Sequence, residues 1–149
     1  MILKRVYAAI PDGEMSPKNI LGIDSAVFRE CGISYRKIEY IKEFSGNVLQ
    51  GKIELEKLQN ADDEAIEILT TSRGIGDWTA KMVLIFSMGR TDVLAHEDLG
   101  IKLAVKKIYG METLPDRELL EKIAEAWRPY RSISSMYLWK HRDGAMNTR

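Results

Sequence analysis

The spacing of apolar residues along the chain follows the period of an α-helix almost throughout. An early stripe is typical, with apolar residues at the i, i+3, i+4 and i+7 positions: Leu3, Val6, Tyr7 and Ile10. Similar stripes recur to about residue 140, and no segment shows the alternation of a half-buried strand. The pattern therefore predicts an all-α fold, a compact bundle of roughly eight or nine short helices.

Capping and breaking residues bound these stripes. Candidate N-caps precede three of them, at Ser16, Asp24 or Ser25, and Ser34, and Pro115-Asp116 starts another. Two helices over about residues 63–88 flank a glycine turn, and further helices extend over about 98–140. No linker or low-complexity segment separates the stripes, so we expect residues 1–149 to form a single domain.

Composition narrows the classes of function. The chain has 22 basic and 22 acidic residues, and this balance excludes a protein that binds polyanions through bulk charge. Its one cysteine, Cys31, excludes an intramolecular disulfide and an iron–sulfur cluster. No apolar run approaches the ~18 residues of a membrane span, and the N-terminus lacks the apolar region of a signal peptide. We expect an intracellular protein without a membrane partner.

The charges are unevenly distributed. Residues 52–68 hold six acidic and two basic side chains, whereas residues 128–149 hold five basic and one acidic. A basic C-terminal edge that lies near a nucleic-acid backbone and a merely solvated terminal helix account for this pattern equally well.

The turn Gly74-Ile75-Gly76 carries the most informative signal. A helix begins directly after it, so the free N–H groups of that helix lie beside the glycines and, with the helix dipole, suit a phosphate. Ile75 would tuck under the turn and pin its two helices together. A tight corner between two helices with no ligand is the alternative, because a lone Gly-x-Gly is a weak signal.

Several blocks at matching spacing resemble the helix-hairpin-helix DNA glycosylase superfamily, closest to its 3-methyladenine DNA glycosylase II branch. The resemblance covers about residues 1–140. It rests on Gly74-Ile-Gly-x-Trp-Thr-Ala80, Asp92-Val-Leu94, Asp98, the segment from Cys31 to Ile41, and Trp127-Arg-Pro-Tyr-Arg-Ser132 with Trp139. It implies the fold of that superfamily, and double-stranded DNA with damaged bases as the partner.

The resemblance implies that Asp98, 20 residues after Trp78, is the catalytic carboxylate. The role is physically reasonable, because cleavage of an N-glycosidic bond builds positive charge on the deoxyribose and a fixed carboxylate stabilises that charge. From pattern alone, Asp98 is an N-cap of the following helix, and the two roles are compatible. Its neighbours His96 and Glu97 are not obvious participants, and His96 is interpreted as a surface or capping residue.

Two tryptophans match the aromatic pocket positions of the family, Trp78 and Trp139. A flipped base stacks on aromatic faces, and a cationic alkylated base gains cation–π attraction. Packing in the core is the alternative for both, and Trp127 is interpreted as a core residue. Related enzymes that also cut the strand carry a lysine where this chain has Trp78, and Lys81 does not match that position. The resemblance therefore implies a monofunctional hydrolase.

The resemblance also assigns the contacts to the DNA backbone. The hairpin residues Gly74, Ile75, Gly76 and Thr79 match the phosphate-binding segment, with amide donors at the two glycines and Thr79. The backbone carbonyls of Thr70, Ser72 and Gly74 match the ligands of a monovalent cation. No other cofactor is implied.

The chain departs from the family at its start, where an upstream helix that lines the pocket is absent. Loss of that helix would expose the stripe from Leu3 to Ile10 and favour a homodimer through it. The leading hypothesis is a base-excision repair enzyme, a monofunctional DNA-3-methyladenine glycosylase-like hydrolase that removes alkylated purines. The alternatives are a non-catalytic helix-hairpin-helix DNA-binding module, inactive because truncated, and a helical interaction protein without a role on DNA.

Overall fold

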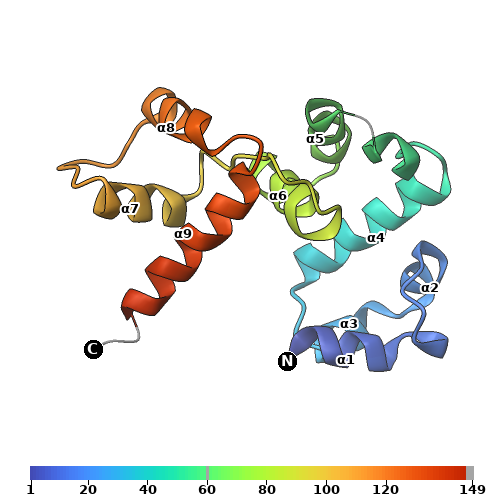
Figure 1. Cartoon of the computed structure of the whole chain (residues 1–149). Helices are drawn as coiled ribbons and strands as arrows, with labels where there is room; N and C mark the ends of the chain where they lie inside the picture. The colour runs from blue at the N-terminus through green and yellow to red at the C-terminus, as the bar shows by residue number, and fades with distance from the viewer. Residues whose placement is uncertain (60, 147–149) are drawn as a thin grey trace. The chain divides into compact units, whose positions relative to one another are not determined.

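The computed structural model describes residues 1–59 and 61–146 (Figure 1). Every regular element among these residues is helical, with nine α-helices, and this confirms the predicted all-α class. The backbone divides into two compact units, from Met1 to Gly76 and from Asp77 onward, and each is described by itself. The single domain predicted over residues 1–149 stays a prediction.

The first unit contains five α-helices and two short 3-10 segments. They are α1 (Ile2–Ala9), η1 (Pro11–Gly13), α2 (Pro17–Gly22), α3 (Ser25–Glu30), α4 (Tyr35–Leu49), η2 (Leu55–Gln59) and α5 (Asp62–Thr70). Two of the predicted N-caps form side-chain bonds: Ser16 accepts from the Asn19 N–H at 3.3 Å, and Asp24 accepts from the Ala26 N–H at 2.7 Å. Ser34 is the N-cap of α4 but makes no side-chain capping bond.

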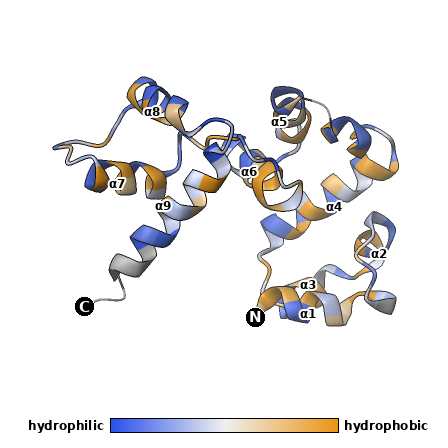
Figure 2. Cartoon of the chain, in the orientation of Figure 1, coloured by the Kyte–Doolittle hydropathy of each residue, from blue (hydrophilic) through white to orange (hydrophobic). Residues whose placement is uncertain are grey.

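The core of the first unit lies between α1, α2, α3 and the start of α4. Figure 2 shows both hydrophobic and hydrophilic residues on each of these helices. This mixture is typical of helices that bury one face and expose the other. The buried cluster is Val6, Ile10, Ile20, Ile23, Phe28, Cys31, Ile33 and Ile38. The expectation that the whole Leu3–Ile10 stripe is exposed is therefore wrong for Val6 and Ile10, because α2, α3 and α4 supply apolar partners for that part of the helix.

The second unit contains α6 (Asp77–Met82), the π-helical segment η3 (Val83–Ser87), α7 (Leu99–Ile108), α8 (Arg117–Ala124), the 3-10 segment η4 (Glu125–Trp127) and α9 (Arg131–Met146). Its core is formed by α7, α8 and α9, and the partly buried Trp127 packs against it as predicted. Asp116 caps α8 by accepting from the Leu119 N–H at 2.9 Å. In the part of the chain that the structure describes, no helix is long and apolar enough to cross a membrane.

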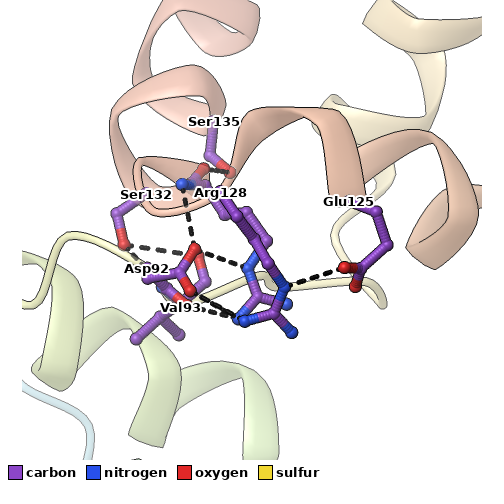
Figure 3. Close-up of polar contacts among 7 residues, drawn as sticks. Asp92, Val93, Glu125, Arg128, Ser132 and Ser135 are labelled. Carbon is purple, nitrogen blue, oxygen red and sulfur yellow. Dashed lines mark hydrogen bonds and ion pairs between the residues drawn. The ribbon is translucent and has the colours of Figure 1, made fainter.

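The start of α9 is fixed to the loop that precedes α7 by a polar network (Figure 3). Arg131 donates to Asp92 through Nε at 2.7 Å and through Nη2 at 3.1 Å, and Arg128 adds a bond of 3.0 Å. The Ser132 hydroxyl accepts from the Val93 N–H at 2.9 Å. Arg128 and Arg131 of the basic C-terminal segment thus have an internal acidic partner, and the network ties the start of α9 to this loop.

Candidate active site

Asp98 lies at the junction of the loop and α7, and its carboxylate accepts three hydrogen bonds. Oδ1 accepts from the Ile101 N–H at 2.8 Å and from the indole Nε1–H of Trp139 at 2.9 Å. Oδ2 accepts from the indole Nε1–H of Trp78 at 2.8 Å. The N-cap interpretation of Asp98 is confirmed, and the same carboxylate gathers tryptophans from α6 and α9.

These bonds control the ionisation of Asp98. Burial alone would raise the pKa of its carboxyl, because a charge loses water there. The hydrogen bonds from Trp139, from the amide groups that open α7 and from Trp78 outweigh burial and lower the pKa below its usual value. Asp98 is therefore an anion at neutral pH, although it is partly buried.

Gly100 makes room for this arrangement. A Cβ atom built there would lie 2.9 Å from Asp98 Oδ1, 3.1 Å from the Trp139 ring and 2.7 Å from Arg142 Nη1. A side chain at this position would push directly on the carboxylate and on its indole partner. The glycine two residues after Asp98 is thus a packing requirement of the site.

Both tryptophans combine a donating edge with a ring that is at least partly accessible. Trp78 is 46% exposed, whereas Trp139 is partly buried and its ring stacks on Phe86 with centroids 5.8 Å apart. Phe86 itself is 61% exposed and lies on the π-helical segment. Sequence reasoning missed Phe86 as a site residue. Phe86 continues the apolar stripe of the helix after the glycine turn, so the pattern indicated only a helical apolar residue there.

A second polar group adjoins the site. Lys81 is buried, and its Nζ donates to Glu97 at 2.7 and 2.9 Å and lies 3.4 Å from His96 Nδ1. The interpretation of His96 as a surface or capping residue is wrong, because its side chain is only 20% exposed and faces Lys81. The signal for this group was a lone lysine on an otherwise apolar helix face, with an acidic residue directly before Asp98.

The glycine turn belongs to the first unit. Gly74 has a φ of +85°, and a Cβ there would collide with the ring of Tyr40 on α4. The guanidinium of Arg73 lies 5.4 Å from the centre of the same ring and pairs with Glu43 at 2.9 Å. Both the dihedral angle and the close approach of an aromatic ring require glycine at this position.

The other residues predicted to bind phosphate differ in whether the protein itself uses their backbone N–H groups. The Ile75 N–H donates to the Ser72 carbonyl at 3.1 Å, so the turn itself uses this amide. Gly76 has an ordinary φ, and nothing lies within 4 Å of the place where a Cβ atom would stand. Thr79 is the third residue of α6, where an amide N–H has no partner within the helix.

The structure thus brings Trp78, Asp98 and Trp139 together in the second unit. Gly74, Ile75 and Gly76, with Thr70 and Ser72, lie in the first unit. An ionised carboxylate beside exposed aromatic rings can stabilise a cation that forms next to it and can hold a flat ring against it. Among the described residues, no cluster of three or more His, Cys, Asp or Glu side chains could hold a metal ion.

Comparisons with known proteins agree with this chemistry. Residues 1–129 match the family described as the HhH-GPD superfamily base excision DNA repair protein. The chain is 36% identical over 129 residues to DNA-3-methyladenine glycosylase 1 of Schizosaccharomyces pombe, a match that covers 84% of this chain and 56% of that protein. It is 32% identical over 125 residues to a putative DNA-3-methyladenine glycosylase of Bacillus subtilis, with 83% and 44% covered. The chain thus spans about half the length of these relatives.

Two solved structures resemble the chain closely. The DNA-3-methyladenine glycosidase of Bacillus halodurans superposes with a TM-score of 0.84 at 34% identity, over 99% of this chain and 68% of that one. The S. pombe glycosylase in complex with abasic DNA gives 0.81 at 33%, over 93% and 69%. The helix-hairpin-helix glycosylase fold predicted from the sequence is confirmed, and this chain belongs to the HhH-GPD superfamily of base excision DNA repair proteins.

Proposed function

We propose that this chain is a monofunctional DNA glycosylase that hydrolyses the N-glycosidic bond of alkylated purines, 3-methyladenine among them, and leaves an abasic site. The observation that carries the proposal is the Asp98 carboxylate, ionised and held by two indole N–H groups beside exposed aromatic rings. The names of the related proteins support the substrate class.

Asp98 would act on the charge that develops in the sugar. As the bond to the base breaks, the deoxyribose becomes oxocarbenium-like, and a fixed anion in a partly dry site lowers the energy of that state. The carboxylate also accepts the proton of the attacking water or orients it. An alkylated purine already carries positive charge, so it leaves without an acid.

Trp78 and Trp139 would serve the site in two ways. Their indole edges donate to Asp98, and the exposed part of the Trp78 ring and the face of Trp139 that does not stack on Phe86 would receive the base. An electron-rich indole face attracts a cationic alkylated base more strongly than a neutral one, which selects damaged purines flipped from the duplex.

DNA would be held through its backbone. The amides of Gly74, Gly76 and Thr79 are the proposed phosphate donors, and Ile75 contributes as part of the turn. Uncharged donors of this kind explain how a chain without net charge binds a polyanion. Acting on DNA, the enzyme would work inside the cell.

We also propose that the backbone carbonyls of Thr70, Ser72 and Gly74 hold a monovalent cation. A carbonyl oxygen has two lone pairs, so Ser72 can accept from Ile75 and still contact an ion. The buried Ser72 hydroxyl has no hydrogen-bond partner, and oxygen ligands suit a hard cation. Such an ion would supply positive charge beside a phosphate.

A homodimer through α1 is proposed from its exposed residues. Ile2, Leu3 and Tyr7 leave about half of their surface in solvent, although Val6 and Ile10 are buried. Sedimentation of the chain with and without a Leu3→Lys change tests it, and a monomer in both cases rejects it.

A base-release assay tests the function. Free methylpurine is measured after incubation with DNA treated with a methylating agent, and the parent should release it while the Asp98→Asn variant should not. Equal release by both proteins would reject the mechanism. Binding of DNA without any release would instead indicate the non-catalytic DNA-binding module.

The glycine turn has its own matched pair of variants. Gly76 and Gly46 both have ordinary backbone angles and open space for a Cβ, so alanine should leave the fold intact at either position. Gly76→Ala should weaken DNA binding and Gly46→Ala should not. Equal affinity of the two variants would remove the turn from the DNA interface.

A further inference from the structure

Lys81 is a charged side chain in an otherwise buried setting. Its side chain is 9% exposed, on the same turn of α6 as the fully buried Ala80. A buried ammonium ion is costly unless its protons find acceptors, and here the two Glu97 oxygens and the His96 ring nitrogen surround it. The fold therefore retains this lysine for the contacts that it makes.

The hydrogen bonds of Lys81 are made to Glu97, the residue directly before Asp98. Trp78 and Lys81 are three residues apart on α6 and so lie on the same helix face. Trp78 binds Asp98 at 2.8 Å, and Lys81 binds Glu97 at 2.7 Å. One helix face thus holds two consecutive residues of the loop, each by its side chain.

We propose that Lys81 is a positioning residue for Asp98, acting through its ion pair with Glu97. The proposal rests on the function proposed above and extends it to a residue that does not touch the substrate. Asp98 is fixed on its other sides by Trp139 and by the start of α7. Without the Lys81 pair, the Trp78 bond would be the remaining side-chain hydrogen bond between the described residues of α6 and Glu97 or Asp98.

The geometry favours positioning over a nucleophilic role for the lysine. Its Nζ forms an ion pair with Glu97, the residue that directly precedes Asp98 in the chain. Burial would raise the pKa of Glu97, but the bond from Lys81 outweighs burial and lowers it, so the partner is an anion. Around Asp98 lie the charged Glu97 and Lys81, the His96 ring, whose pKa is lowered by burial and by the Lys81 charge, and the Arg142 guanidinium of α9.

Three substitutions separate positioning from charge. Lys81→Met removes the tie and leaves Glu97, which is 29% exposed, to be hydrated. Lys81→Arg keeps a cation that can bind both carboxylate oxygens. The double change Lys81→Met with Glu97→Gln removes the tie and leaves no lone charge, so it remains informative if the single variant unfolds.

The rate of base release under single-turnover conditions is the first measurement. A shift of about 1 Å in a catalytic group can cost ~100-fold, so we expect Lys81→Met and the double variant to lose 10-fold or more while binding abasic DNA within about twofold of the parent. Lys81→Arg should retain most of the rate. Lys57→Met is the matched control, because Lys57 pairs with Glu54 at 2.9 Å on the surface of the first unit.

The indole N–H signals of Trp78 and Trp139 provide a second measurement that needs no activity. Followed by NMR through an acid titration, they report when Asp98 takes up a proton. In Lys81→Met a looser Trp78 bond and an uncompensated Glu97 both raise the pKa of Asp98, so the midpoint should move to higher pH, whereas Lys57→Met should leave it unchanged.

Two outcomes overturn the proposal. One is a Lys81→Met protein that is folded and has the parent's rate and titration midpoint. The other is a Lys81→Arg protein that loses as much of its base-release rate as Lys81→Met. The fit of the lysine side chain in its buried site, and not its ion pair with Glu97, would then explain the loss. A parent that releases no base would refute the proposed function instead, and the indole titration would then decide on Lys81 by itself.

Discussion

Replacement of Asp98 by asparagine should create a specific conflict with one tryptophan. The two indole donors are divided between the two carboxylate oxygens, Trp139 on Oδ1 and Trp78 on Oδ2. An asparagine has one oxygen and one NH2 group, so an amide that satisfies Trp139 and the Ile101 N–H turns its NH2 toward Trp78. Two donors would then face each other where 2.8 Å now separates donor from acceptor.

The size of the effect follows from these contacts. Hydrogen bonds to a charged group contribute about 1.5–3 kcal/mol, neutral ones about 0.5–1.5 kcal/mol, and an unpaired buried donor costs about 1–3 kcal/mol. Trp78 is 46% exposed and can turn its N–H to water, so the lower ends of these ranges apply. We expect Asp98→Asn to reduce the free energy of unfolding by about 2 kcal/mol at pH 7, or Tm by about 4–8 °C.

A double-mutant cycle isolates the conflict. Trp78→Phe should cost about 1 kcal/mol in the parent, because it removes a bond to the carboxylate, and should cost nothing or stabilise in the Asp98→Asn background. Urea unfolding of the four proteins gives the coupling energy, about 1–2 kcal/mol. Base release should be lost in both proteins that carry the Asp98→Asn change, whatever their stability. Additive effects within about 0.3 kcal/mol would refute the division of the two indole donors between the two oxygens.

Three further changes are expected to have distinct signatures. Trp139→Phe removes a charge-assisted hydrogen bond to Asp98 and should raise the pKa of its carboxyl, which moves the acid limb of the base-release profile to higher pH; an unmoved limb contradicts this. Arg131→Met should cost about 2 kcal/mol in urea unfolding at pH 7. Because the arginine contacts hold the pKa of Asp92 low, this loss should shrink as pH falls through that pKa, and a pH-independent loss would contradict the ion pair. Gly74→Ala should cost about 1–3 kcal/mol through its positive φ, and the collision with the Tyr40 ring adds to this, seen as a lower Tm; an unchanged Tm would show that the turn relaxes freely.

Local signals in the sequence predicted the helices and most of their ends. Ser16, Asp24 and Asp116 cap helices because the bond each makes spans two or three residues, and such a bond depends little on the rest of the fold. The glycine turn and the N-cap role of Asp98 are local in the same sense. Its catalytic role came from the resemblance and stays a prediction until base release is measured.

Contacts between distant residues could not be predicted in this way. Arg131 and Asp92 are 39 residues apart, and Lys81 and Glu97 are 16 apart, so neither pair follows from helix periodicity. For the same reason, the charge count of residues 128–149 gave no sign that Arg131 pairs with Asp92. The π-helical turn at Val83–Ser87 was missed as well, since its apolar residues continue the stripe of α6 and only tertiary packing distinguishes the two helix types.

The choice of donors around Asp98 follows from the reaction proposed for it. An arginine or lysine bound directly to the carboxylate would also keep it ionised, but its positive charge would cancel the field that an oxocarbenium-like sugar needs. The indole and amide N–H groups that lower the pKa of Asp98 are neutral dipoles, so they keep the carboxylate ionised without adding positive charge themselves. Lys81 directs its ammonium group to the neighbouring Glu97, where it can fix the loop at little electrostatic cost to Asp98. The indole and amide donors keep Asp98 ionised, and the Lys81–Glu97 pair one residue away fixes the loop, so together they meet two requirements of such a site, an ionised group and a fixed one.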